Sequence, residues 1–234
     1  MMAVGLTQAE VQPYLADVKD EEPVVVACCN SPQSLTLSGH RKLLEALSER
    51  FVQDGIFARM LKVELAYHSP YMLAIAEEYQ RTIQHLRPAS AGNGVAMIST
   101  VTGTPIEPAQ LDAAYWVRNM CSPVLFAQAL ETSLSTPTGG TSNDSKLPSS
   151  TLEVGPHGAL QAPIRQLLTE KDLTHKISYT SVLTRGKDAL ISSMEAAGAL
   201  WCRGHNVDLG KVNEGKGQSR PQRVLRDLPP YPWK

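Results

Sequence analysis

One histidine of this sequence stands where an α/β protein usually holds its reacting groups. His68 follows an extended, largely apolar stretch, 57–67, and precedes a helical pattern that begins at Tyr71. The carboxyl ends of strands in an α/β sheet are where ligands and reacting side chains gather. A neutral imidazole there could take the proton of a serine hydroxyl. His68 could instead cap the following helix or face solvent, and spacing alone favours these structural roles.

Two further polar residues follow predicted strands. His157 stands at the predicted start of a helix, where the positive end of the helix dipole disfavours an imidazolium, and a packing role is favoured for it. Asn30 ends an apolar run, and its amide could bind a ligand or bond within its own turn, with the turn bond favoured. The remaining histidines lie on predicted helix faces or in loops, and we assign them no role: His40, His85, His175 and His205.

The common nucleotide and nucleophile motifs do not occur in the 234 residues. Neither G-x-G-x-x-G nor G-x-x-x-x-G-K-[ST] is found, and the nucleophile elbow G-x-S-x-G is not found either. Its nearest approach ends at Ser142, in a polar tract with no strand before it and no helix after it, which disfavours a hydrolase built on Ser142. The four cysteines form no C-x-x-C pair or metal-type cluster. We therefore expect reduced, partly buried thiols, no metal and no bound cofactor.

The first third of the chain predicts the order strand-helix-strand-strand-helix-strand, the split arrangement of a ferredoxin-like domain. Thr7 followed by Glu10 is a capping-box pattern, and it starts a helix that runs towards residue 17. Apolar residues recur at helical spacing after Arg41 until Gly55 ends that helix. The predicted strands of this part are 1–6, 24–29, 34–38 and 57–67.

The remainder alternates helices and strands and predicts an α/β fold. Residues 135–150 are polar, rich in Ser and Thr, and contain a single Leu, so we expect a disordered surface insertion. Residues 210–220 are polar and loose, and 228–233 form a proline-stiffened tail that we expect to pack on a neighbouring surface. The predicted helices are 71–86, 109–120, 123–134 with Pro123 in its first turn, 156–168 and 188–202, and the predicted strands are 95–101, 151–154 and 177–183.

Composition excludes several classes of partner. The chain has 42% apolar and 19% charged residues and a net charge of -1, an ordinary globular mixture with no field that would draw it to nucleic acid or to an anionic membrane. A ferredoxin-like fold can bind RNA through aromatic residues on its sheet, but the predicted strands of that part carry only Phe57 and Tyr67 and no basic patch, which argues against RNA binding. No apolar run reaches the roughly 18 residues that span a bilayer. We see no secretory signal and expect a cytoplasmic protein.

Six blocks together resemble the acyltransferase domain of fungal iterative, highly reducing polyketide synthases, and they occur in the family's order. The blocks are Met2–Leu6, Val26–Pro32 with Leu35–Gly39, Ala66–Ser69 with Met72, Tyr115–Asn119 with Ser122–Phe126, Glu153–His157, and Leu228–Trp233. The resemblance implies transfer of malonyl from malonyl-CoA to an acyl carrier protein, whose phosphopantetheine arm would receive it. It implies no cofactor of the protein's own.

The resemblance also assigns roles to single residues. It makes His68 the general base and places Tyr67 where malonyl-selecting members carry a bulky residue, which implies a malonyl preference. By the same resemblance Asn30 and Leu125 would contribute to the substrate site, with the backbone carbonyl near Leu125 orienting the His68 ring. His157 would support the site from behind.

The same resemblance divides the chain into three parts. It implies a ferredoxin-like small subdomain at 1–67, the C-terminal part of an α/β-hydrolase-like core at 68–205, and a linker at 206–234. In the family, the G-H-S-x-G elbow and a carboxylate-binding arginine precede the small subdomain. We therefore expect the chain to be inactive alone and to expose apolar surface. A second polyketide synthase chain could supply the serine, or the protein could be a non-catalytic carrier-protein docking module or a gene relic.

Overall fold

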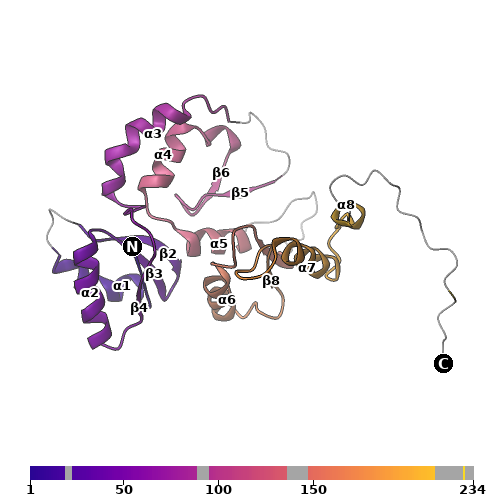
Figure 1. Ribbon diagram of the computed structural model, residues 1–234, viewed down its shortest axis with the longest axis horizontal. Coiled ribbons are helices and arrows are strands. Elements are labelled where there is room, and N and C mark those ends of the chain that lie inside the picture. The colour runs from indigo at the N-terminus through magenta and orange to yellow at the C-terminus, as the bar shows by residue number, and fades with distance from the viewer. Residues whose placement is uncertain (19–22, 89–94, 136–146, 214–228, 230–234) are drawn as a thin grey trace.

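The structure of the protein is a computed structural model that describes residues 1–18, 23–88, 95–135, 147–213 and 229. Its helices and strands form a mixed α/β fold in three regions that follow one another along the chain (Figure 1). We call residues 1–60 the N-terminal region, 61–121 the middle region and 122–213 the C-terminal region. Helices α3 and α4 lie together above the N-terminal sheet in Figure 1, and α6 and α7 lie to its right.

The N-terminal region is a four-stranded antiparallel sheet of order β2-β3-β1-β4. Its elements follow the predicted order strand-helix-strand-strand-helix-strand. They are β1 (Met2–Val4), α1 (Gln8–Ala16), β2 (Val25–Ser31), β3 (Ser34–Ser38), α2 (Arg41–Gln53) and β4 (Ala58–Met60).

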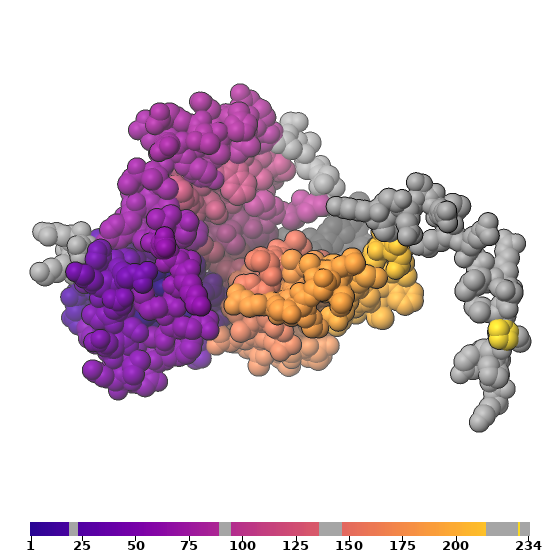
Figure 2. All heavy atoms as spheres, in the orientation of Figure 1, coloured from indigo at the N-terminus to yellow at the C-terminus, as the bar shows by residue number. Residues whose placement is uncertain are grey.

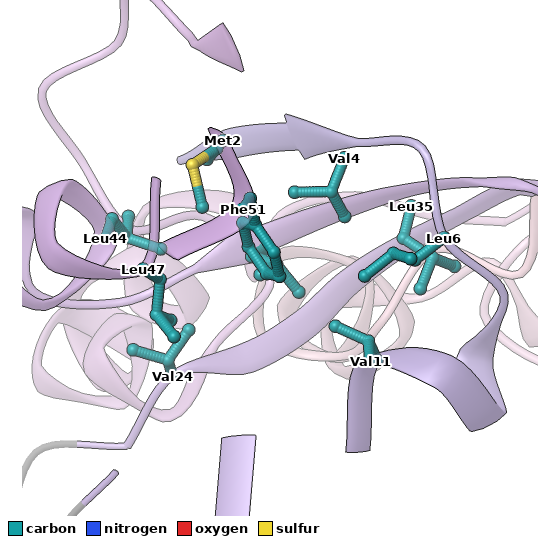
Figure 3. Packing of buried hydrophobic residues seen from close by; sticks show 10 residues of the cluster. Met2, Val4, Leu6, Val11, Val24, Leu35, Leu44, Leu47 and Phe51 are labelled. Atoms are coloured by element: carbon teal, nitrogen blue, oxygen red, sulfur yellow. The ribbon is translucent and has the colours of Figure 1, made fainter. Parts of the chain in front are cut away.

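Local signals set the helix limits of this region. The Thr7 hydroxyl accepts a hydrogen bond from Glu10 N, and the Glu10 carboxylate accepts one from Thr7 N, so the predicted capping box is formed. Gly55 has a positive φ of 71° just after α2, a conformation that glycine adopts without a steric penalty. Phe51 lies fully buried between the helices and the sheet, next to Leu44 and Leu47 of the same helix (Figure 3).

The strand predicted over 57–67 is much shorter in the structure. It ends at Met60, which pairs with Met2, and the last backbone bond to the first strand runs from Leu61 N to Met1 O. Residues 62–67 pair with no strand of this sheet in the structure, and an extended stretch without a partner does not form a ladder. Leu65 and Tyr67 are exposed. His68 therefore lies in a turn rather than at the end of a strand.

The middle region contains short elements where longer ones were predicted. The helix expected over 71–86 begins as a 3-10 turn, η1 (Pro70–Ile75), and continues as α3 (Ala76–Ile83). The strand expected over 95–101 is a two-residue pair of β5 (Met97–Ile98) with β6 (Pro105–Ile106). The helix expected over 109–120 divides into η2 (Pro108–Gln110) and α4 (Ala113–Cys121), since the Asp112 carboxylate caps a new helix at Tyr115 N.

The C-terminal region is built on a two-stranded parallel sheet, β7 (Ser150–Glu153) with β8 (Ser178–Ser181). Its helices are α5 (Phe126–Ser135), α6 (Gln161–Glu170), α7 (Ala189–Trp201) and α8 (Leu209–Asn213). A second apolar core joins α5, α6 and the approach to β8, and its buried members are Leu134, Ile164, Leu167, Leu168 and Ile177. The short helix α8 replaces part of the loose segment predicted over 210–220.

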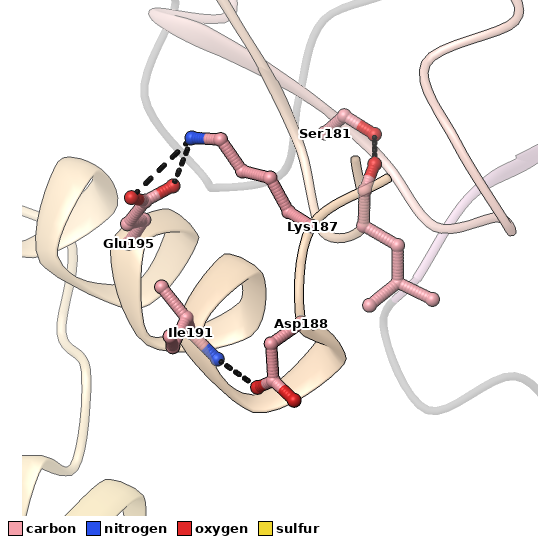
Figure 4. Close-up of polar contacts among 6 residues, drawn as sticks. Ser181, Lys187, Asp188, Ile191 and Glu195 are labelled. Carbon is pink, nitrogen blue, oxygen red and sulfur yellow. Dashed lines mark hydrogen bonds and ion pairs between the residues drawn. The ribbon is translucent and has the colours of Figure 1, made fainter. Parts of the chain in front are cut away.

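Helix α7 is fixed at its start by polar contacts (Figure 4). The Asp188 carboxylate accepts hydrogen bonds from the backbone N–H groups of Leu190 and Ile191, and Lys187 pairs with Glu195 at 3.1 Å. Its flank is open, because Leu190, Ile191 and Trp201 are all more than half exposed. Figure 2 shows the orange part of the chain, which includes α7, on the outer face of the molecule.

Parts of the predicted organisation lie outside the described residues. These are most of the insertion expected over 135–150 and almost all of the tail expected over 228–233. Among the residues that the structure describes, no helix is both long enough and apolar enough to cross a membrane.

Candidate functional site

His68 is held in a strained turn near the start of the middle region. Its φ is +57°, a left-handed conformation that side-chain-bearing residues rarely adopt and that costs about 1–3 kcal/mol. The Ser69 hydroxyl donates to the carbonyl of Ala66 at 2.5 Å, and His68 N donates to the carbonyl of Met120 at 3.1 Å. Strain of this kind persists only where the surroundings hold it in place, and such positions cluster at functional sites.

The imidazole ring of His68 is oriented by two backbone carbonyls. Its Nδ1 lies 3.0 Å from the oxygen of Asn119 and 3.1 Å from the oxygen of Ser122. A carbonyl oxygen only accepts, so Nδ1 carries the proton and donates it. In the neutral ring Nε2 then has a lone pair, which is what a general base needs.

The end of helix α4 provides these carbonyls. The last carbonyls of a helix have no partner within the helix and must find one elsewhere. Here the carbonyl of Asn119 takes the ring Nδ1–H of His68 and that of Met120 takes its backbone N–H. The interaction is mutual, because His68 satisfies the helix end while the helix end fixes the ring.

The predicted orienting carbonyl near Leu125 corresponds to that of Ser122, three residues earlier, and the carbonyl of Leu125 itself is engaged elsewhere. The carbonyl of Leu125 accepts from Ala129 N at 3.0 Å and so begins α5, and its N–H donates to Thr100 O at 2.7 Å. Asn119 and Ser122 do the orienting instead. Both belong to sequence blocks that carried the resemblance, but neither was singled out, since nothing in the sequence points from His68 to a carbonyl more than 50 residues away.

An extended connector, residues 122–125, ties the site to β2. Val124 N donates to Ala27 O at 2.8 Å and Cys29 N donates to Val124 O at 2.9 Å, so the connector runs beside β2. This pairing explains why α5 begins at Phe126 rather than at Pro123, since the backbone of Val124 is already committed to the sheet. The carbonyl of Ser122 therefore has a fixed place relative to β2.

Tyr67 and Asn30 have side chains with different surroundings. Tyr67 precedes His68 and is 40% exposed, so its ring can meet a ligand. Asn30 lies within β2, and its Nδ2 donates to Thr36 Oγ1 of β3 at 3.3 Å rather than to a turn of its own. Their proposed substrate contacts stay predictions.

His157 does not stand at the start of a helix. The N-cap of α6 is Leu160, and the Nε2 atom of His157 accepts a hydrogen bond from Arg185 Nη2 at 3.0 Å. The helix start is occupied by Glu153, whose carboxylate accepts from Ala159 N at 2.9 Å and from Leu160 N at 3.1 Å. The structure thus assigns the capping contact to Glu153, which was not singled out in the sequence.

Tyr179 completes this arrangement. Its hydroxyl donates to Glu153 Oε2 at 2.5 Å, and burial together with the adjacent carboxylate raises its pKa to about 12. The ring leaves no room above Gly158, because a Cβ there would lie 2.7 Å from the Tyr179 oxygen. The first turn of α6 is therefore closed by the protein's own groups.

The three partly buried cysteines, Cys28, Cys29 and Cys121, have the character of unreactive thiols. All four are free, as predicted, and three are partly buried, whereas Cys202 is exposed. Burial raises the pKa of Cys28 to about 11, which leaves little thiolate at neutral pH. Within the described ranges no three His, Cys, Asp or Glu side chains come together in a way that could hold a metal ion.

Comparison with known sequences gives a consistent result. The family model described as "Acyl transferase domain" matches residues 1–201. Highly reducing polyketide synthase alnA of Emericella nidulans is 43% identical over 242 residues, which cover 100% of this chain and 10% of that protein. Reducing polyketide synthase rads1 of Floropilus chiversii is 41% identical over 245 residues with the same two coverages. The chain spans about a tenth of the length of these curated relatives.

Solved structures show the same likeness. The acyltransferase domain from the second module of the salinomycin polyketide synthase has a TM-score of 0.73 and 28% identity, covering 94% of this chain and 48% of that one. A loading acyltransferase from the avermectin modular polyketide synthase has a TM-score of 0.69 and 26% identity, covering 86% of this chain and 58% of that one. The mixed α/β fold is that of such domains, and the resemblance expected from the six sequence blocks is confirmed.

Proposed function

Since the chain belongs to the acyl transferase domain family, we propose that it supplies the general base of a serine–histidine malonyl transferase in a polyketide synthase. The observation that carries the proposal is the orientation of His68, whose Nδ1–H is held by two carbonyls while Nε2 is left to accept a proton. The nucleophilic serine and the arginine for the malonyl carboxylate would come from a G-H-S-x-G-bearing segment outside the 234 residues.

The reaction would proceed in two acyl transfers. In the first, the serine oxygen attacks the thioester carbon of malonyl-CoA, His68 Nε2 takes the serine proton, and that proton leaves with the CoA thiolate. In the second, the phosphopantetheine thiol of an acyl carrier protein attacks the serine ester. His68 takes the thiol proton and returns it to the serine oxygen.

Three neighbouring features support this assignment. Tyr67 lies next to the base with an exposed ring, in keeping with a role in selecting malonyl over branched substrates. The strand order β2-β3-β1-β4 suits a ferredoxin-like small subdomain, and the parallel pair β7-β8 suits part of a hydrolase-like core.

The test is complementation with a second chain that carries the serine and the arginine. Malonyl transfer to an acyl carrier protein, normalised to the complex recovered, should appear only when both chains are present. His68→Ala should lower this rate by about two to four powers of ten without preventing assembly. His157→Ala should cost less, because that side chain bonds only Arg185 among the described residues.

Three outcomes would count against the proposal. Near wild-type transfer by His68→Ala together with loss in His157→Ala would move the base elsewhere. A serine-linked malonyl adduct on the isolated chain would show another nucleophile. Carrier-protein binding without any transfer in the complete complex would favour the docking module.

A further inference from the structure

Ser69 is a buried serine beside the proposed base, and the mechanism above gives it no part. Only 1% of Ser69 is exposed, and its hydroxyl donates to the carbonyl of Ala66. Its own carbonyl accepts from Met72 N at 3.1 Å, at the start of η1, and Met72 is buried as well. Ser69 is thus hydrogen-bonded to Ala66, which precedes His68, and to Met72, which follows it.

The hydrogen bond between the Ser69 hydroxyl and the Ala66 carbonyl closes a turn of four residues. The two residues inside this turn are Tyr67 and His68, and His68 is the residue with the positive φ of 57°. A side-chain-bearing residue relaxes towards negative φ when nothing holds it. Such a change would rotate the Cα–Cβ bond of His68 and take Nδ1 away from the carbonyls of Asn119 and Ser122.

We propose that Ser69 is a positioning residue for His68. Its hydroxyl keeps the turn closed, the closed turn keeps His68 in the left-handed conformation, and that conformation keeps Nδ1–H on the two carbonyls. Ser69 itself touches no reacting atom. The proposal rests on the proposed function only where a transfer rate is measured, because the tautomer and orientation of the ring can be observed without any reaction.

The first measurement is nitrogen NMR of the full 234-residue chain with labelled histidine, using His68→Ala to assign the signal. The wild-type ring should be Nδ1-protonated when neutral. In Ser69→Ala the share of the Nε2-protonated form should rise about ten-fold, since the carbonyls no longer select one tautomer. Ser69→Cys, whose thiol is somewhat larger than the hydroxyl and donates only weakly, should behave like Ser69→Ala.

Ser69→Thr is the rescue variant. It keeps the hydroxyl, and the extended backbone of Ser69, with φ -140° and ψ 167°, suits a β-branched residue. Ser181→Ala is the matched control, because Ser181 Oγ also donates to a nearby carbonyl, that of Leu183 at 2.8 Å, in a different part of the fold. Ser69→Thr should show the wild-type tautomer of His68, and Ser181→Ala should leave that tautomer unchanged.

The second measurement is transfer in the complemented enzyme. Ser69→Ala should lower kcat about ten-fold with an unchanged KM for malonyl-CoA, and Ser69→Thr should recover most of kcat. An unaltered His68 tautomer in both Ser69→Ala and Ser69→Cys, with only a lower melting temperature, would overturn the proposal in favour of a purely structural serine. If the tautomer shifts as expected while His68→Ala does not affect transfer, the positioning role stands and the proposed function fails.

Discussion

The N-terminal and C-terminal regions solve the problem of burying apolar surface in different ways. In the N-terminal region two helices cover one face of a four-stranded sheet, and Met2, Phe51 and Leu44 are fully buried there. In the C-terminal region the sheet has two parallel strands, Val154 after β7 is 80% exposed, and Leu190 on α7 is 65% exposed. Parallel sheets are normally covered on both faces. We call the first region closed because its two helices cover the core face of its sheet, even though Val52 on α2 is exposed. We call the second region open because apolar residues are exposed both next to its sheet and on α7.

The difference matters for the site because residues adjoining both regions hold His68 in place. The turn that holds His68 follows the closed region, whereas the Ser122 carbonyl begins the open one. The ring is therefore only as well placed as the less stable of its two supports.

Phe51→Ala should produce the largest loss of stability. The ring is fully buried against the sheet, and removal of a buried phenylalanine costs about 3–5 kcal/mol through lost transfer energy and a cavity. The control is the adjacent Val52→Ala, which changes a side chain that is 68% exposed and should alter stability by less than about 0.5 kcal/mol. Denaturant unfolding followed by circular dichroism measures both. Similar losses for the two variants would show that the core lies elsewhere.

Leu167→Ala tests the open region directly. Leu167 is as fully buried as Leu44, so equal packing would predict equal losses of about 2–5 kcal/mol for the two alanine variants. We expect the free energy of unfolding to fall less in Leu167→Ala than in Leu44→Ala. In a region that is open on one side, less apolar surface packs around the side chain that is removed. Amide hydrogen exchange should agree, with faster exchange in β7 and β8 than in β2 and β3. Equal protection of the two sheets would remove the contrast.

Tyr179→Phe should change the alkaline limb of stability. Folding raises the Tyr179 pKa from 10.0 to about 12, so the folded state favours the protonated phenol. That contribution is fully present below pH 10 and is lost as the pH rises towards 12. The wild-type melting temperature should therefore fall more steeply than that of Tyr179→Phe over this interval. Tyr67→Phe, which changes an exposed ring, should leave the slope as in the wild type.

Leu190→Glu should have the smallest effect on the chain by itself. The side chain is already 65% exposed, so a carboxylate there stays hydrated and stability should change by less than about 0.5 kcal/mol. The same change should weaken association with the serine-bearing chain if that chain covers α7. Val52→Glu, at an equally exposed position of the closed region, should leave association unchanged. A pull-down titration of the two variants against the wild type decides whether α7 is a covered face.

Local chemistry explains which parts of the fold were predictable. The capping box of Thr7 and Glu10, the end of α2 at Gly55 and the strand over 34–38 depend on residues close in sequence, and all three are present. The length of β4 depends instead on which of its residues pair in the sheet, and sequence pattern does not report that. The start of α5 was misplaced for the same reason, because the pairing of Val124 with β2 is tertiary.

The candidate site shows the same limit. Spacing alone favoured a structural role for His68, and only the resemblance made it a base. Its orienting carbonyls belong to Asn119 and Ser122, more than 50 residues away, and a backbone carbonyl has no signature in a sequence. The helix-start position predicted for His157 was wrong. Helix α6 begins only after Leu160, and the carboxylate of Glu153 accepts the backbone N–H groups of Ala159 and Leu160 there.

The connector of residues 122–125 couples the position of the His68 imidazole to the position of the N-terminal sheet. It carries the Ser122 carbonyl at one end and pairs with β2 two residues later, at Val124. Two events that bias one shared element are linked by equal free energies in both directions. A partner that binds one position of β2 more tightly therefore also favours one orientation of the His68 imidazole. A substrate that contacts the imidazole must strengthen the binding of that partner to the sheet by the same free energy.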